Sequence, residues 1–74
     1  MVFERLRKLI SQQTRLDEDE INIESSFEDD LRFDDLDMID LIFAAEDEFN
    51  IKIDSGSDFG TVGEMVQCIQ NQLG

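Results

Sequence analysis

Apolar residues recur at helical spacing in three separate stretches of this chain, and no stretch of useful length alternates between apolar and polar residues as a strand would. The first stretch covers about residues 2–14, the second follows Asp34, and the third follows Thr61. Asp34 is a suitable N-cap, and Thr61 with Glu64 three residues later matches a capping box. The chain is therefore predicted to be all-α, a small bundle of three main helices with a long first connection and a loop or short helix before the last helix.

The length of 74 residues predicts a single domain, residues 1–74, with one small hydrophobic core. Residues 15–33 lack a sustained period and contain neither Gly nor Pro, so we expect a long loop pinned to the core rather than a flexible linker. The expected apolar anchors of the two connections are Leu16, Ile21, Ile23, Phe27, Leu31, Phe33, Ile51 and Ile53, with turn residues at 55–57. The expected core of the bundle consists of Phe3, Leu6, Leu41, Ile42, Phe49, Val62, Val66 and Ile69.

Charge is distributed unevenly along the chain, whose formal net charge is −13. Residues 17–48 contain fifteen Asp or Glu and a single base, Arg32, whereas four of the six basic residues precede this segment, namely Arg5, Arg7, Lys8 and Arg15. Such an acidic surface repels nucleic acid and anionic membranes and attracts basic protein surfaces. The sequence therefore predicts basic protein partners, with no nucleic-acid binding and no membrane insertion.

The second predicted helix carries two different sides. One apolar stripe, assigned to the core, consists of Met38, Leu41, Ile42, Ala45 and Phe49. The other side alternates apolar and acidic residues, namely Leu36, Ile39, Asp40, Phe43 and Asp47. On charge alone, a solvated surface is the simpler interpretation of these acids, but the apolar side chains among them favour a contact surface.

No group of residues indicates catalysis or a resident metal. The chain has no His and no Gly-rich phosphate loop, and Cys68 lies among apolar residues where a buried, inert thiol is expected. The window that begins at Asp54 fails the calcium-loop pattern, because Phe59 occupies the Gly position and Met65 the final acid position. Weak divalent-cation binding by surface carboxylates stays open. A lone cysteine forms no internal disulfide, which favours the cytoplasm, and no export signal is recognisable.

Several segments carry one further pattern: an acidic run at residues 26–31, then Asp34-Asp35-Leu36-Asp37, then residues 39–42 and 45–53. Together they resemble the acyl carrier protein family, in which the serine of an Asp-Ser-Leu-Asp signature is esterified to 4′-phosphopantetheine. The resemblance implies a carrier of the fatty-acid or polyketide type and places Asp35 at the attachment position. Because a carboxylate has no hydroxyl to esterify, the resemblance also implies that the cofactor cannot be attached at Asp35.

The resemblance further implies that other proteins contact the second helix. The implied contact residues are Asp34, Leu36, Asp37, Ile39, Asp40, Phe43, Glu46 and Asp47. The implied partners are the phosphopantetheinyl transferase and the enzymes of fatty-acid or polyketide synthesis, approached through basic surfaces by a monomeric carrier. Charge would steer the encounter and a small apolar strip would add short-range affinity.

The sequence departs from the family at three places besides Asp35. Arg32 stands where Gly is usual, Asp54 stands where Pro is common, and the segment before the last helix is somewhat shorter. Arg32 is placed to pair with Asp34 or Asp35. Two explanations of Asp35 remain open, a deliberate substitution that blocks modification and a paralogue that has drifted from carrier duty. The alternative function is a non-carrier interaction module that binds basic partners through its acidic helix.

Overall fold

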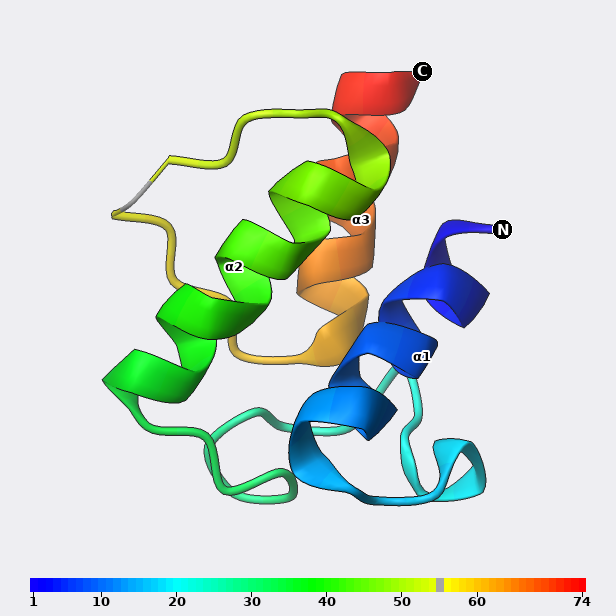
Figure 1. Cartoon of the computed structure of the whole chain (residues 1–74), viewed down its shortest axis with the longest axis vertical. Helices are drawn as coiled ribbons and strands as arrows, with labels where there is room; N and C mark the ends of the chain where they lie inside the picture. The colour runs from blue at the N-terminus through cyan, green and yellow to red at the C-terminus, as the bar shows by residue number, and fades with distance from the viewer. Residues whose placement is uncertain (55) are drawn as a thin grey trace.

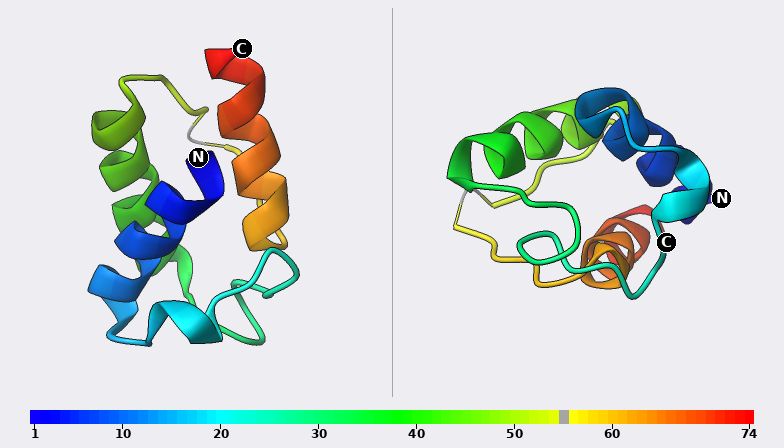
Figure 2. Two further views of the ribbon diagram at one scale, coloured as in Figure 1. Left: turned by 90° about the vertical axis from the view of Figure 1, so that its right-hand side faces the viewer. Right: turned by 90° about the horizontal axis from the view of Figure 1, so that it is seen from below.

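The computed structural model describes residues 1–54 and 56–74, and contains three α-helices, α1 (Val2–Thr14), α2 (Asp35–Phe49) and α3 (Val62–Leu73). A short 3-10 turn, η1 (Glu18–Glu20), lies in the first connection. Figures 1 and 2 show the three helices around a common centre, with the first connection closing one end of the bundle. The β pairing in the described part of the chain is limited to an isolated bridge between Ser26 and Thr61. The predicted all-α fold is confirmed.

The starts of α2 and α3 are fixed by side-chain caps that the sequence predicted. The backbone N–H of Asp37 donates to Asp34 Oδ1 at 2.9 Å, and the Asp34 N–H donates back to Asp37 Oδ2 at 3.0 Å. Thr61 and Glu64 make the same reciprocal pair, with distances of 3.2 Å and 3.0 Å. Each pair satisfies two backbone donors that the helix itself cannot use. Both predicted N-caps are confirmed.

The three helices bury their apolar stripes against one another. The buried helical residues are Leu6, Ile10, Leu41, Ile42, Ala45, Phe49, Val62, Met65, Val66 and Ile69. Burying a Leu or Ile side chain stabilises the fold by about 1.5–3 kcal/mol, so this stripe-to-stripe contact holds the bundle together. The predicted core is confirmed except for Phe3, which is partly buried at the rim under the Arg7 guanidinium, 4.8 Å from its ring centroid. Cys68 is also only partly buried.

The first connection is pinned to the core by its own apolar residues, as predicted. Its buried members are Ile21, Phe27, Leu31 and Phe33. The rings of Phe27 and Phe33 pack with centroids 5.3 Å apart. Backbone bonds tie the same segment to the start of α3: the Val62 N–H donates to the Ser25 carbonyl and the Phe27 N–H to the Gly60 carbonyl, each at 3.0 Å.

Ile23 was predicted to be a core anchor but is 44% exposed, so that prediction is wrong. It lies instead against the first turn of α3. The Gly63 N–H donates to the Ile23 carbonyl at 2.8 Å, and a Cβ on Gly63 would lie 2.8 Å from Ile23 Cγ2. Gly63 therefore permits a close approach between the first connection and α3 that a side chain would prevent.

The second connection is a loop in its described residues, one of the two forms that the sequence allowed. Ile53 is buried and Ile51 partly buried, so both predicted anchors reach the core. Of the predicted turn at residues 55–57, Ser55 lies outside the described residues. The short helix that the sequence also allowed before the last helix is absent from the described part of this connection. No helix in the described residues is both long and apolar enough to cross a membrane.

Candidate functional site

Asp35 is the first residue of α2, and its side chain is exposed. The described residues provide no hydrogen bond and no ion pair to its carboxylate. Its neighbours Asp34 and Asp37 form the capping box, so three carboxylates lie in or beside the first turn of the helix. The helix dipole stabilises negative charge at this end. The start of α2 is therefore stabilised by its capping box and by the helix dipole, without a hydroxyl at residue 35.

A shallow hollow lies beside Asp35, between the start of α2 and the two connections. Its lining residues are Ser26, Phe27, Glu28, Asp29, Phe33, Asp34, Asp35, Met38, Asp58, Phe59 and Gly60. Five of these carry carboxylates and none is basic. The surroundings of residue 35 are therefore strongly anionic.

The outer side of α2 exposes large apolar side chains. Leu36 is 71% exposed, Ile39 46% and Phe43 64%. Asp40 and Asp47 are exposed on the same helix, whereas Met38, Leu41, Ile42, Ala45 and Phe49 point into the bundle. The predicted division of the helix into a core stripe and an outer side is confirmed. We call Asp34, Leu36, Asp37, Ile39, Asp40, Phe43 and Asp47 the α2 face.

Glu46 differs from the α2 face, although the sequence grouped it there. Its side chain is partly buried, and Glu46 Oε2 accepts a hydrogen bond from the Ile53 N–H at 2.8 Å. One carboxylate oxygen is therefore occupied in holding the second connection against α2. Sequence reasoning missed this internal bond because the two residues lie seven positions apart, across the end of a helix.

The predicted pairing of Arg32 with Asp34 or Asp35 is wrong. Within residues 1–54 and 56–74, the ion pairs are Arg5 with Glu48 and Arg7 with Glu18. Arg32 instead has a φ of 60°, a left-handed conformation that costs a non-glycine residue about 1–2 kcal/mol. The Gly that the resemblance implies for this position would adopt this φ without strain.

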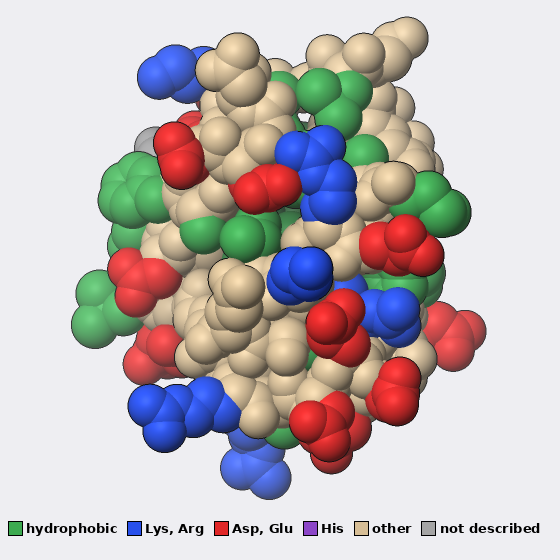
Figure 3. Space-filling view, turned by 45° about the vertical axis from the view of Figure 1, so that its right-hand side comes forward, with side chains coloured by type: hydrophobic (Ala, Val, Ile, Leu, Met, Phe, Trp, Pro, Cys, Tyr) green, Lys and Arg blue, Asp and Glu red, His purple; other side chains and the backbone are tan. Residues whose placement is uncertain are grey.

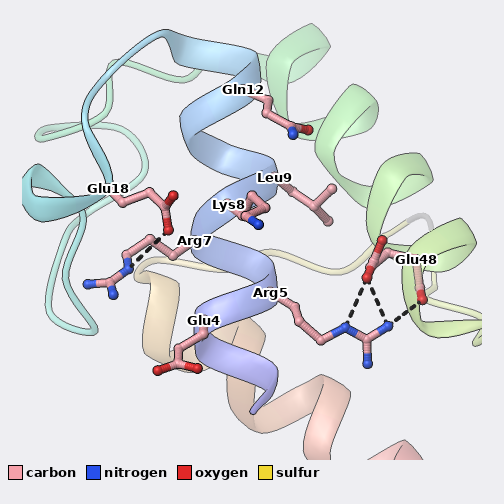
Figure 4. A pocket seen from close by; sticks show the side chains of 8 residues that line it. All are labelled: Glu4, Arg5, Arg7, Lys8, Leu9, Gln12, Glu18 and Glu48. Atoms are coloured by element: carbon pink, nitrogen blue, oxygen red, sulfur yellow. Dashed lines mark hydrogen bonds and ion pairs between the residues drawn. The ribbon is translucent and has the colours of Figure 1, made fainter.

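Two basic residues of α1, Arg5 and Arg7, lie close to acids of neighbouring elements. Figure 4 shows Arg5 reaching across to the end of α2, where its Nε donates to Glu48 Oε2 and its Nη2 to the Glu48 carbonyl, both at 2.9 Å. The same guanidinium lies 4.5 Å from the centroid of the Phe49 ring. Arg7 Nε lies 4.0 Å from Glu18 Oε1, too far for a hydrogen bond. The sequence did not predict these pairs.

Both α1 arginines line a second hollow, together with Glu4, Lys8, Leu9, Gln12, Glu18 and Glu48. Three bases and three acids balance there. Figure 3, which views this side, shows basic side chains interleaved with acidic ones. This hollow therefore carries little net charge, in contrast to the anionic surroundings of Asp35. Among the residues described, no cluster of three or more potential metal ligands is formed.

The comparison with protein families decides the family. The model described as "Phosphopantetheine attachment site" matches residues 4–69, which is most of the chain. The chain belongs to the phosphopantetheine-attachment family. It is 42% identical over 72 residues to the acyl carrier protein of Clostridium acetobutylicum, covering 95% of this chain and 94% of that protein. It is 40% identical over 75 residues to the acyl carrier protein of Phenylobacterium zucineum, covering 99% of this chain and 95% of that protein.

The family assignment confirms the resemblance seen in the sequence. Acyl carrier proteins are carriers rather than enzymes and work with the enzymes of fatty-acid synthesis, so the prediction of a non-enzymatic carrier protein is confirmed. Nothing in the comparisons supports the alternative of a non-carrier module. The family implies 4′-phosphopantetheine as the prosthetic group.

The residues present at the start of α2 do not fit that group. A phosphodiester to a side chain needs a hydroxyl, and Asp35 ends in a carboxylate. The two serines of the first connection lie in turns, where Ser25 Oγ accepts from the Asn22 N–H at 2.9 Å and Ser26 Oγ from the Asp29 N–H at 3.1 Å. Neither serine lies at the start of a helix, where the attachment serine of the signature is expected.

Proposed function

We propose that this chain is a carrier-family protein that keeps the α2 face for binding other proteins and does not take phosphopantetheine at residue 35. The observation that carries the proposal is the pairing of an exposed apolar strip, Leu36, Ile39 and Phe43, with a carboxylate at the attachment position. Leaving three large apolar side chains in water forgoes the stabilisation that burying them would give. Such a strip is therefore typical of a surface that contacts another protein.

The partners that fit this face are proteins with basic surfaces and a small apolar contact. Asp34, Asp37, Asp40 and Asp47 supply negative charge that steers a basic surface into contact. The three apolar side chains then add short-range affinity over a small area, which suits a complex that forms and dissociates quickly. In this family such partners are the phosphopantetheinyl transferase and the enzymes of fatty-acid or polyketide synthesis. Glu46 contributes less to this attraction, because one of its carboxylate oxygens accepts a hydrogen bond from the Ile53 N–H.

Three further properties belong to the same proposal. Residues 1–74 act as one domain, supported by a single core cluster to which all three helices contribute. The protein is a monomer, because a net charge of −13 opposes association between copies. It works in the cytoplasm, where its one cysteine, Cys68, stays reduced.

The test is intact-mass spectrometry after incubation with coenzyme A and a transferase that modifies the C. acetobutylicum acyl carrier protein. We expect the parent chain to keep its mass and Asp35→Ser to gain one phosphopantetheine group. Asp35→Ala is the matched control, since it removes the charge without supplying a hydroxyl and should stay unmodified. Modification of the parent would show that another residue is the attachment site. If Asp35→Ser folded but stayed unmodified, the transferase would not recognise the α2 face as that of a carrier.

A further inference from the structure

The geometry of the α2 face does not depend on residue 35. The first turn is held by the reciprocal bonds between Asp34 and Asp37, and Gln13 Nε2 on α1 donates to the Asp37 carbonyl at 2.8 Å. The Asp35 side chain contributes to none of these bonds. Replacing the family's serine by Asp therefore removes the nucleophile and leaves the surrounding surface in place.

Enzymes that act on carriers differ in how much of their binding comes from the carrier surface. An enzyme that processes the acyl chain also binds the phosphopantetheine arm, so it loses that part of its affinity when the arm is missing. The enzyme that attaches the arm must recognise a carrier without it, and its contact with the carrier comes from the protein surface alone. A chain that never carries the arm therefore keeps its full contact with the enzyme that attaches the arm.

We infer that this chain is a competitive blocker of the enzyme that transfers phosphopantetheine from coenzyme A to a carrier serine. The inference rests on the proposed function, because it requires the α2 face to be a carrier surface. The chain occupies the carrier site of the enzyme and offers no hydroxyl, so no group is transferred and the complex dissociates unchanged. The affinity comes from Leu36, Ile39 and Phe43 with the acids around them. The degree of inhibition then depends on the amount of this chain, because it increases with the ratio of this chain to modifiable carriers.

The experiment measures transfer to the Asp35→Ser variant in the presence of the parent chain, with the transferase named above. Both proteins present the same α2 face, so the inhibition constant of the parent should lie within about threefold of the KM of Asp35→Ser. Inhibition should be competitive with carrier, which means that excess Asp35→Ser restores the full rate. Direct binding of the parent to the transferase, measured by calorimetry, should give the same constant without any turnover.

Matched charge reversals locate the contact. Asp40→Lys in the parent should raise the inhibition constant about tenfold or more, because it removes an attraction and adds a repulsion at the face. Asp19→Lys makes the same change of charge in the exposed 3-10 turn and should leave the constant nearly unchanged. Equal effects of both reversals would show that only net charge matters and would overturn the docking of the α2 face.

The outcomes separate the inference from the proposed function. If Asp35→Ser is modified but the parent inhibits more than about tenfold more weakly than that KM, the inference is overturned and the proposed function stands. If Asp35→Asn then inhibits well, the negative charge of Asp35 is what excludes the parent from the enzyme. If a folded Asp35→Ser is never modified, the proposed function fails and the inference fails with it.

Discussion

Arg5 and Arg7 on α1 each face a carboxylate of another element, whereas Asp40 and Asp47 on the outer side of α2 have no basic partner among the residues that the structure describes. The apolar residues differ in the same way. Of those on the outer surface of α1, Phe3 lies under Arg7, while Phe43 on α2 is 64% exposed. Both helices are amphipathic, but Phe3, Arg5 and Arg7 of α1 contact other side chains, while Phe43, Asp40 and Asp47 of α2 are exposed to solvent.

This difference shows that high charge alone does not mark a binding surface. The hollow on α1 is lined by six charged residues, but its three bases and three acids cancel one another locally. The α2 face has charges of one sign and exposed apolar residues between them. A field of one sign steers partners, and a balanced one does not. The α2 face is therefore the more informative place for substitutions.

The largest expected effect separates the two sides of α2. Phe49 is 5% exposed and Phe43 is 64% exposed on the same helix. We expect Phe49→Ala to lower the free energy of unfolding by about 3–5 kcal/mol, because it leaves a cavity and removes the ring beneath Arg5. Phe43→Ala should change it by about 0.5 kcal/mol or less. Urea denaturation followed by circular dichroism measures both, and equal losses would mean that Phe43 is part of the core.

A smaller effect is expected at Arg32, whose backbone has a φ of 60°. Arg32→Gly should raise the free energy of unfolding by about 0.5–1 kcal/mol, since Gly adopts a φ of 60° without strain and the entropy cost of Gly offsets part of the gain. Arg32→Ala removes the same charge and keeps the strain, so it should give no gain. Stabilisation by Arg32→Ala would show that the charge, and not the backbone, is unfavourable. Thermal melts of both variants decide between these.

The smallest effect tests whether the α1 pairs matter for stability. Arg5 and Glu48 are half and one-third exposed respectively, so Arg5→Gln should cost only about 0.2–1 kcal/mol despite its two hydrogen bonds. Asp40→Asn on the α2 face is the comparison and should leave stability within about 0.5 kcal/mol. The cost at Arg5 should shrink in high salt, which screens exposed pairs. If Asp40→Asn cost more than Arg5→Gln, Asp40 would have an internal role and the contrast between the helices would be lost.

Much of the fold follows from neighbours in the sequence. Helical spacing placed the inward stripe of α2, and the pairs Asp34–Asp37 and Thr61–Glu64 fixed the starts of two helices. These features involve residues three or four positions apart, whose geometry is set once the backbone is helical. That residue 35 ends in a carboxylate, with no hydroxyl to esterify, likewise follows from one position of the sequence.

The tertiary structure decided everything that joins distant segments. Arg5 meets Glu48 across 43 positions, because α1 and α2 cross at that point. Ile21 is buried and Ile23 exposed, although both are isolated Ile residues in an irregular loop with no period to distinguish them. Glu46 near the end of α2 accepts a hydrogen bond from the Ile53 N–H, and Arg32 forms no ion pair with Asp34 or Asp35 among the described residues. The sequence by itself determined the helices and the caps of α2 and α3, because these depend on local geometry. Only packing determined which charges are paired and which stay exposed to solvent, since that depends on how separate helices and loops meet in space.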